Sequence, residues 1–252
     1  MELIAQGRSA DVYEVERGRV LRRYRSDIDA GLEARVMLHL EERGFPVPHV
    51  FDADGTDLVM ERVDGGTLFE ALLHEPGQYR RYGRLLGELH ERLHRLDAPA
   101  WLGSVSAGQV GGADISGTDG ARGLDGGYVA RRVIVHRDLH PQNVILSERG
   151  PVVIDWTDVG AGTAAMDTAI TVILTLGAEL EAPAEVVERI EPFRALFVDA
   201  YLETCGADPR DGLDEAIAFR ALNPSNTATE AAWLRASAPR CLDSYFLEPR
   251  AV

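Results

Sequence analysis

The segment from residue 133 to residue 156 constrains the fold more than any other part of the chain. It reads VIVHRDLHPQNVILSERGPVVIDW, so three apolar residues lead into a polar loop that carries His136, Asp138 and Asn143. Two further short apolar runs follow, separated by a polar stretch that ends in Gly-Pro, and Asp155 comes directly after the second run. Short apolar runs bounded by turn residues favour strands. The segment therefore predicts a hairpin and a preceding loop that together present polar anchors at one place.

These anchors are the groups that phosphoryl transfer requires. The reaction needs a carboxylate beside the attacking hydroxyl and oxygen ligands that hold Mg²⁺ on the phosphates, because positioning and charge neutralisation supply most of the catalysis. Asp138, Asn143 and Asp155 offer these groups, in the spacing HxDxxxxN followed by an aspartate twelve residues later. Chance would produce the whole pattern in fewer than about one chain in a thousand.

The segment resembles the catalytic loop and metal-binding strand of the aminoglycoside phosphotransferase and choline kinase-like family, a branch of the protein-kinase-like superfamily. Ile-Asp-Trp in place of Asp-Phe-Gly is typical of that branch. The resemblance implies that Asp138 is the catalytic base or orients the hydroxyl, that Asn143 and Asp155 bind Mg²⁺, and that His136 supports the loop. It also implies a structural role for Asp167, which ties the next helix to the catalytic loop.

Two neighbouring polar residues each allow two interpretations. His140 lies two residues after Asp138, where protein kinases carry a lysine, so it either acts with Asp138 at the γ-phosphate or is a surface histidine. Asp158 either orients a second metal ion or a cationic substrate, or caps the turn before Gly160.

The fold class implied by the resemblance is α+β, a bilobal protein-kinase-like fold. Residues 1–63 predict a small antiparallel lobe, with hairpins at 11–24 and 50–60 on either side of a helix at 27–43. The apolar residues of that helix recur at helical spacing and are expected on one face: Ile28, Leu32, Val36 and Leu40. Residues 64–252 predict a larger helical lobe for catalysis and substrate binding. It starts with a helix at 78–96 and has helices over most of 164–247. Residues 104–127, rich in Gly, Ser and Asp, predict a mobile loop, a lid or a plain linker.

Nucleotide-binding residues are expected in the smaller lobe. Gly7 and Ser9 belong to a segment that resembles the family's shortened phosphate loop, although it lacks GxGxxG and is equally typical of an ordinary turn. By the same resemblance the Leu58–Val63 stretch binds adenine, with Met60 at the gate and base contacts from the backbone of Glu61 and Val63. A buried edge strand is the alternative for that stretch.

The third strand departs from the family. The resemblance requires a lysine that grips the α and β phosphates, and Arg22 stands there instead, two residues after Val20, which is expected to pack on the purine. Arginine binds phosphate oxygens bidentately, but its planar guanidinium is not equivalent to an ammonium group. The chain contains no lysine at all. Glu33 matches the glutamate that pairs with this cation, and Glu41 and Glu42 are the alternatives.

Composition limits the partners. The net charge of −15 argues against nucleic acid or an anionic membrane as a partner. No apolar run is long enough to span a bilayer, and the N-terminus lacks the basic and apolar regions of a signal peptide, so a cytoplasmic location is expected. Two cysteines are too few for a disulfide framework. A monomer and a homodimer both remain open.

Substrate identity is expected to depend on the last third of the chain. Residues 177–215 hold eleven acidic residues against three arginines, and they either line a pocket for a cationic substrate such as an aminoglycoside or form a solvated surface. A later polar set is a candidate for contact with the acceptor: Asn223, Asn226, Glu230, Trp233 and Arg235.

The predicted function is transfer of the γ-phosphate of ATP or GTP, with Mg²⁺, to a hydroxyl of a small molecule. An antibiotic and a metabolite are both open as acceptors. The alternative function is a nucleotide-binding sensor or pseudokinase without turnover, which the arginine at position 22 and the short phosphate loop favour.

Overall fold

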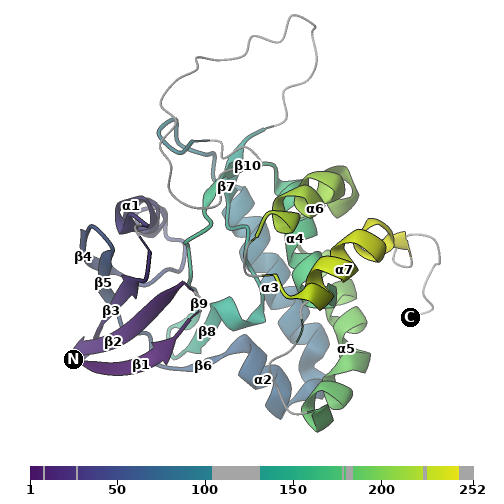
Figure 1. The fold of residues 1–252 in the computed structure, drawn as a ribbon, viewed down its shortest axis with the longest axis horizontal. Coiled ribbons are helices and arrows are strands. Elements are labelled where there is room, and N and C mark those ends of the chain that lie inside the picture. Colours follow the sequence, from purple (N-terminus) through teal and green to yellow (C-terminus); the bar gives the residue numbers. More distant parts are fainter. Residues whose placement is uncertain are drawn as a thin grey trace, which may run out of the picture.

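A computed structural model describes the protein at residues 1–7, 9–26, 28–103, 131–177, 179, 184–223 and 226–243. The N-terminal strands and one helix gather at one end of the molecule, and the long helices gather at the other (Figure 1). The stretch 104–127, predicted as a loop, lies outside the described residues.

A five-stranded antiparallel sheet forms the smaller end, in the order β1-β2-β3-β5-β4. Its strands are β1 (Glu2–Gln6), β2 (Ala10–Glu16), β3 (Arg19–Tyr24), β4 (Val50–Asp54) and β5 (Asp57–Glu61). Both predicted hairpins are confirmed. Gly18 turns β2 into β3 with a φ of 80°, a conformation that glycine adopts at little cost. The arrangement makes β3 the central strand, with neighbours on both sides.

Helix α1 (Ala30–Glu41) connects the two hairpins and lies inside the predicted range 27–43. Val36 and Leu40 are fully buried, as the helical spacing predicts. Leu32 was expected on the same face but is 43% exposed, whereas Glu33 is only 4% exposed. The buried stripe follows the spacing i, i+3, i+7 from Glu33, which leaves Leu32 at its edge. The helix therefore turns a carboxylate inward.

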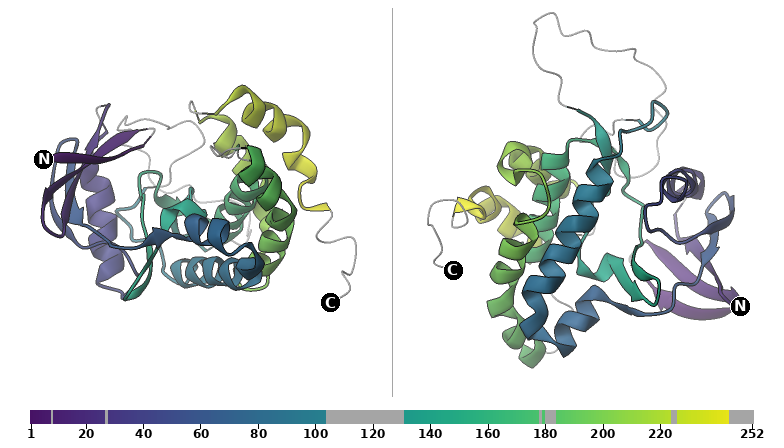
Figure 2. Two further views of the ribbon diagram at one scale, coloured as in Figure 1. Left: turned by 90° about the horizontal axis from the view of Figure 1, so that it is seen from below. Right: turned by 180° about the vertical axis from the view of Figure 1, so that it is seen from behind.

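The larger end is mainly helical, as predicted (Figure 2). Its helices among the described residues are α2 (Leu68–His74), α3 (Tyr79–His94), α4 (Ala164–Gly177), α5 (Ala184–Leu202), α6 (Leu213–Ala221) and α7 (Ala228–Ala236). Short 3₁₀ turns are η1 (Pro76–Gln78), η2 (Pro141–Asn143), η3 (Pro209–Gly212) and η4 (Ala238–Arg240). The apolar face of α3 is buried through Leu86, Leu89 and Leu93.

Helices α3 and α5 lie side by side in close contact (Figure 2). A Cβ atom added at Gly83 would lie 2.5 Å from the carbonyl oxygen of Phe197, and one added at Gly87 would lie 2.5 Å from that of Tyr201. Real Cβ atoms do not approach a backbone so closely. The two glycines therefore set the distance between the helices that carry much of the larger end.

Short strands position the polar segment between the sheet and the helices. The pairs are β7 (Val133–Val135) with β10 (Gly160–Gly162), and β6 (Gly66–Thr67) with β8 (Val144–Ser147), which also pairs with β9 (Gly150–Val153). The predicted β8–β9 hairpin is confirmed. The loop between β7 and β8 and the residues between β9 and β10 therefore both connect these two small sheets.

Surface properties follow from this packing. Most acidic residues of the 177–215 region that the structure describes are exposed, which favours a solvated surface for that region: Glu185, Glu188, Glu191, Glu203, Asp211, Asp214 and Glu215. Among the described residues we find no helix with the length and apolar character needed to cross a bilayer.

Candidate active site

The loop after β7 rests on one buried carboxylate. Asp167, in the first turn of α4, is fully buried and accepts hydrogen bonds from the backbone N–H groups of His136 at 2.8 Å and Arg137 at 2.7 Å. Arg137 has a positive φ of 66°, a conformation uncommon outside glycine. Two amides aimed at one carboxylate hold this turn in place, and Asp167 has the tying role that the resemblance implies.

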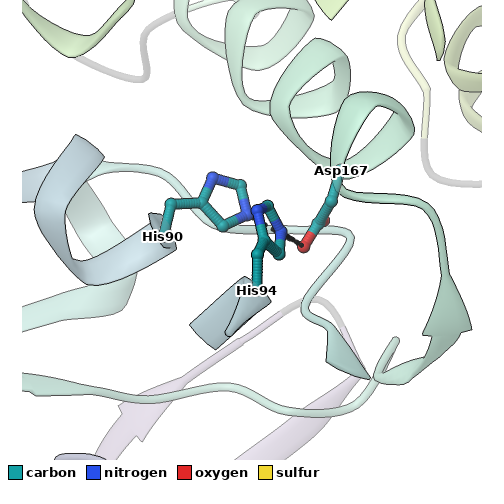
Figure 3. Close-up of side chains that lie close together, drawn as sticks. All are labelled: His90, His94 and Asp167. Atoms are coloured by element: carbon teal, nitrogen blue, oxygen red, sulfur yellow. Dashed lines mark hydrogen bonds and ion pairs between the residues drawn. The ribbon is translucent and has the colours of Figure 1, made fainter. Parts of the chain in front are cut away.

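Two histidines complete the shell around Asp167 (Figure 3). The Nε2 atoms of His90 and His94, one turn apart on α3, lie 2.8 and 3.1 Å from Oδ2 of Asp167. The Nδ1 atom of His90 lies 2.6 Å from the hydroxyl of Tyr201 on α5. The nitrogen and oxygen atoms of these three residues that could bind a metal ion lie within 4.8 Å of one another. The hydrogen bonds described above already involve all three residues.

Burial and the neighbouring side chains shift the pKa values of Asp167 and His90. Burial alone would raise the pKa of Asp167, but His90 and His94 hold it well below its ordinary value. Burial lowers the pKa of His90 to about 4, and His94 adds to this effect. At physiological pH, Asp167 is therefore an anion beside the neutral imidazole of His90.

His136 links the loop to the strand that precedes Asp155. It is fully buried, and its Nε2 atom lies 3.1 Å from the carbonyl oxygen of Ile154. Its Nδ1 atom accepts a hydrogen bond from the backbone N–H of Asp138 at 3.2 Å, and its ring packs on Trp156 at a centroid distance of 4.5 Å. Burial lowers the pKa of His136, which keeps the ring neutral.

The structure brings Asp138, His140 and Asn143 together. The Nδ2 atom of Asn143 donates to the backbone oxygen of Asp138 at 2.8 Å and to Oδ2 of its carboxylate at 3.2 Å. The same nitrogen lies 3.3 Å from Nε2 of His140, which is 3.6 Å from Oδ2 of Asp138. The side chain of Asp138 is 27% exposed, so a ligand can reach it.

Arg22 reaches Asp155 from the sheet. Its Nη2 atom donates to Oδ1 of Asp155 at 2.6 Å, and its Nη1 atom donates to Oε1 of Glu33 at 3.2 Å. Arg22 is 7% exposed. Burial alone would raise the pKa of Asp155, but Arg22 lowers it to about 2, so the carboxylate is ionised. Asp155 itself has a positive φ of 63°, which directs it out of the strand.

The structure selects Glu33 as the partner of Arg22 from the three glutamates that the sequence left open. Glu33 also accepts hydrogen bonds from the hydroxyl of Tyr24 and from the backbone N–H of Trp156, the latter at 3.1 Å. Glu41 instead pairs with His49 at 2.9 Å, and the side chain of Glu42 is 76% exposed. Glu33 thus joins the sheet, helix α1 and the segment after β9.

Thr157 is a residue of this cluster that the sequence did not single out. Its hydroxyl lies 2.9 Å from Nη2 of Arg22 and donates to Oδ1 of Asp155 at 2.8 Å. In the sequence, only its position two residues after Asp155 could have indicated a place in the site. A threonine two residues after an aspartate is too common to be specific.

Asp158 is influenced by the negative charges of Asp138 and Asp155. Burial raises its pKa to about 6, the charges of Asp138 and Asp155 add to the rise, and Arg220 opposes it. The turn before Gly160 is held by the backbone N–H of Val159, which donates to the carbonyl of Trp156 at 3.2 Å. The structure therefore favours a position in the site over the cap.

The remaining predicted nucleotide residues lie on β3 and β5 or next to the ends of β2 and β5. The backbone N–H of Gly7 donates to the carbonyl of Ala10 at 2.8 Å, and the carbonyl of Ser9 accepts from the backbone N–H of Arg25 at 3.0 Å. Val20 is paired with Met60 across the sheet.

Further along, the Glu61 backbone N–H donates to the carbonyl of His49 at 2.8 Å. The backbone N–H of Val63 has no backbone partner in the part of the chain that the structure describes.

Arg220 is the second residue that the sequence missed. It lies on α6, 82 positions from Asp138 in sequence, and its Nη1 atom is 3.3 Å from Oδ1 of Asp138. It also lines a hollow together with three residues of the predicted acceptor set, Asn226, Glu230 and Trp233. Arg235 is exposed instead. No local pattern around Arg220 indicates this contact.

The solved structures that share this fold include a choline/ethanolamine kinase family protein and aminoglycoside phosphotransferases. A choline/ethanolamine kinase family protein from Mesorhizobium loti superposes with a TM-score of 0.57 at 13% identity, over 94% of this chain and 86% of that one. The ADP-bound aminoglycoside phosphotransferase APH(2'')-Ib gives 0.55 at 12%, over 95% and 93%. An aminoglycoside-3'-phosphotransferase of type VIII gives 0.51 at 22%, over 97% and 92%.

Sequence comparison adds the family. Among curated proteins, none matches this chain. The model of the phosphotransferase enzyme family (APH), however, matches residues 1–114 and 121–214, which is most of the chain. With the bilobal fold and the loop geometry described above, this match establishes that the chain belongs to the phosphotransferase enzyme family.

Proposed function

We propose that this enzyme transfers the γ-phosphate of ATP or GTP to a hydroxyl of a small molecule, with Mg²⁺, in the cytoplasm. The observation that carries the proposal is a pair of polar clusters, one hydrogen-bonded and one ion-paired, which the backbone hydrogen bond from Ile154 to Asn143 at 3.0 Å brings together. Asp138 and Asn143 contact each other at 3.2 Å on the loop, and Arg22 bridges Asp155 and Glu33 at 2.6 and 3.2 Å. These are the groups that phosphoryl transfer uses to align a hydroxyl and to bind phosphates.

Asp138 is the proposed catalytic base, and His140 its neighbour at the phosphoryl group. In the reaction the acceptor oxygen forms a bond to the γ-phosphorus, the bond from that phosphorus to the bridging oxygen breaks, and the nucleoside diphosphate leaves. The hydroxyl proton passes to Asp138. The Nδ2 atom of Asn143 donates to the backbone oxygen and to Oδ2 of Asp138. The carboxylate is therefore oriented before the acceptor arrives.

The nucleotide is proposed to lie between residues 1–63 and residues 64–252. Gly7 and Ser9 would face the phosphates, Val20 and Met60 would contact the base, and backbone groups of Glu61 and Val63 would hydrogen-bond it. The N–H of Val63, which has no backbone partner among the described residues, supports that last assignment. Arg22 would bind phosphate oxygens with its guanidinium, held in place by Glu33.

Mg²⁺ would be held by Asn143 and Asp155, and it would neutralise charge on the phosphates. The donor set fits the ion. Each side chain uses one atom for the protein, Nδ2 of Asn143 and Oδ1 of Asp155. Oδ1 of Asn143 and Oδ2 of Asp155 make no hydrogen bond to other described residues. Oxygen ligands are those that Mg²⁺ prefers.

A second candidate is a nucleotide-binding sensor without turnover. One observation favours it: Arg22 is already shared between Asp155, Glu33 and Thr157, so phosphates would have to compete for the guanidinium. A sensor would bind Mg²⁺-nucleotide but would not consume it with any acceptor.

The test is the variant Asp138→Asn, which removes the base and keeps the shape. Nucleoside diphosphate release is measured with a panel of hydroxylated amines, acids and sugars, and nucleotide binding is measured by thermal shift with and without Mg²⁺. Loss of the base lowers turnover by about 10²–10⁴-fold while binding persists. Asp54→Asn, an exposed substitution on β4, is the matched control. Full turnover in Asp138→Asn contradicts the assigned base, and binding without turnover in the wild type favours the sensor.

A further inference from the structure

The guanidinium of Arg22 is held at both of its terminal nitrogens. Nη1 donates to Oε1 of Glu33 at 3.2 Å, and Nη2 donates to Oδ1 of Asp155 at 2.6 Å and to the hydroxyl of Thr157 at 2.9 Å. The side chain is buried. These bonds use the fork of the guanidinium, because two separate nitrogens reach partners on α1 and on the segment after β9.

A tyrosine hydroxyl connects the two ends of this fork. Tyr24 lies two residues after Arg22 on β3, so both side chains point to the same face of the sheet. Its ring centroid is 5.1 Å from the guanidinium carbon of Arg22. Its hydroxyl donates to Oε2 of Glu33, the oxygen that Arg22 does not use, and lies 2.9 Å from the hydroxyl of Thr157. The four side chains therefore form a closed ring of hydrogen bonds.

Thr157 joins this ring to Asp155. Its hydroxyl donates to Oδ1 of Asp155 at 2.8 Å, and the same oxygen accepts from Arg22. Tyr24 is buried, and burial raises the pKa of its hydroxyl, which therefore stays protonated. Neither hydroxyl carries a charge at physiological pH, so what the two contribute to the network is the orientation of the charged groups.

Orientation matters for a long side chain that lies between two carboxylates. An arginine side chain has about 2 kcal/mol of rotamer entropy to lose when it is fixed. Glu33 and Asp155 alone would attract the cation without setting the plane of the guanidinium, whereas the ring sets Nη1 against Glu33 and Nη2 against Thr157. Because this network is complete before a ligand binds, less entropy is lost when an anion is bound.

A lysine at position 22 would not complete the ring. Its ammonium group is a single nitrogen on a flexible stem, so it cannot reach Glu33 and Thr157 from the two separate positions that Nη1 and Nη2 occupy. The hydroxyls of Tyr24 and Thr157 would then lose the cation that they orient. The surroundings of position 22 therefore fit arginine better than the lysine that the family resemblance requires there.

We propose that Tyr24 and Thr157 are positioning residues of the nucleotide site. They hold the guanidinium of Arg22 in the orientation in which it binds phosphate oxygens, and they make position 22 of this chain specific for arginine. This inference rests on the proposed function, because it assumes that the phosphates of a nucleotide lie at Arg22. Restoring the family's lysine at this position should therefore weaken phosphate binding.

The first test is Arg22→Lys, with binding of a nucleoside diphosphate and of its nucleoside measured by calorimetry. The full chain with Mg²⁺ is titrated with ADP and adenosine, and in parallel with GDP and guanosine. Loss of the oriented guanidinium should weaken diphosphate binding by about 10- to 100-fold and leave nucleoside binding within about twofold of the wild type. Arg23→Lys, exposed on the same strand, is the matched control, because Arg23 pairs with Asp57 at 2.7 Å instead.

Further variants test the two hydroxyls. Thr157→Val and Tyr24→Phe preserve the size of the side chain and remove one hydroxyl each, and each should weaken diphosphate binding by about three- to tenfold. Thr157→Ser retains the hydroxyl and should bind as the wild type does. Thr204→Val is the matched control for the threonine, since its hydroxyl donates to the backbone oxygen of Arg84 at 3.0 Å. Tyr79→Phe, on α3, is the control for the tyrosine.

The outcomes separate this inference from the proposed function. Thermal unfolding verifies that each variant is folded, and the two hydroxyl variants carry the test if Arg22→Lys is not. If the wild type binds the diphosphate and Arg22→Lys binds it as tightly or more tightly, the inference is wrong. It is also wrong if Thr157→Val or Tyr24→Phe binds the diphosphate as the wild type does, or weakens nucleoside binding to the same extent. A wild type that binds no nucleotide would contradict the proposed function itself, and this inference with it.

Discussion

The two sides of the catalytic loop differ in how completely their polar groups are paired. Beneath the loop, the carboxylate of Asp167 is fully buried and receives two backbone N–H groups and two imidazoles. On the other side, which consists of α6 and α7 and is called the acceptor side here, the side chain of Arg220 makes a single long hydrogen bond among the described residues and borders a hollow. A fully paired buried group holds one geometry, whereas a partly paired group has donors left for a ligand. The structure thus places a fully paired carboxylate beneath the loop and a partly paired guanidinium beside Asp138.

The same contrast appears in the residues that supply each side. The underside uses α3, α4 and α5, which are packed closely through Gly83 and Gly87. The acceptor side uses α6 and α7, which make fewer contacts with the rest of the chain. We expect the underside to determine stability and the acceptor side to determine which molecule is bound.

The largest expected effect is on the underside. Asp167→Asn removes the charge that four donors share, and the new amide group places its own N–H donors against them. Breaking a buried, hydrogen-bonded charge cluster costs about 3–5 kcal/mol, so the free energy of unfolding in urea should fall by that amount. Asp54→Asn, exposed on β4, should change it by less than about 0.5 kcal/mol. An unchanged midpoint for Asp167→Asn would mean that this cluster does not anchor the loop.

A smaller effect concerns pH. His90 has its pKa lowered by burial to about 4 in the folded protein, against 6.5 ordinarily, and it faces His94, Asp167 and Tyr201. As pH falls below 6.5 the unfolded chain takes up this proton before the folded one, so stability present above 6.5 is lost as pH falls toward 4. The expected loss between pH 7 and pH 5 is about 2 kcal/mol.

Urea unfolding at a series of pH values measures this dependence. His90→Gln should flatten the curve, although His136 leaves some slope because burial lowers its pKa in the same direction. The exposed His74 on α2 provides the control, and His74→Gln should keep the wild-type slope. A curve for His90→Gln that is as steep as that of the wild type would contradict the neutral state assigned to His90.

The smallest effect is expected on the acceptor side. Asn226→Ala removes the hydrogen bond to the carbonyl of Arg220 at the edge of the hollow, which is worth about 1 kcal/mol of folding free energy. Urea unfolding of Asn226→Ala and Asp167→Asn under the same conditions gives the ratio of their losses in unfolding free energy. If Asn226→Ala proved as destabilising as Asp167→Asn, the two sides of the loop would not differ as described here.

Much of the fold was predictable from local patterns. The hairpins of the sheet, helices α1 and α3 and the β8–β9 hairpin follow from apolar spacing and turn residues, and the structure confirms them. The exposure of Leu32 is the exception, because helical spacing fixes which residues share a stripe but not which edge of that stripe meets the sheet.

The site divides in the same way. The sequence by itself determined the loop that carries Asp138 and Asn143, and the aspartate after β9, because those groups are close along the chain and their spacing is constrained by chemistry. Only the tertiary structure decided that Arg22 pairs with Glu33 rather than Glu41 or Glu42, and that Arg220 meets Asp138 from 82 positions away. Such contacts depend on how whole helices pack against one another, and packing is set by the shape of the entire core rather than by any local run of residues.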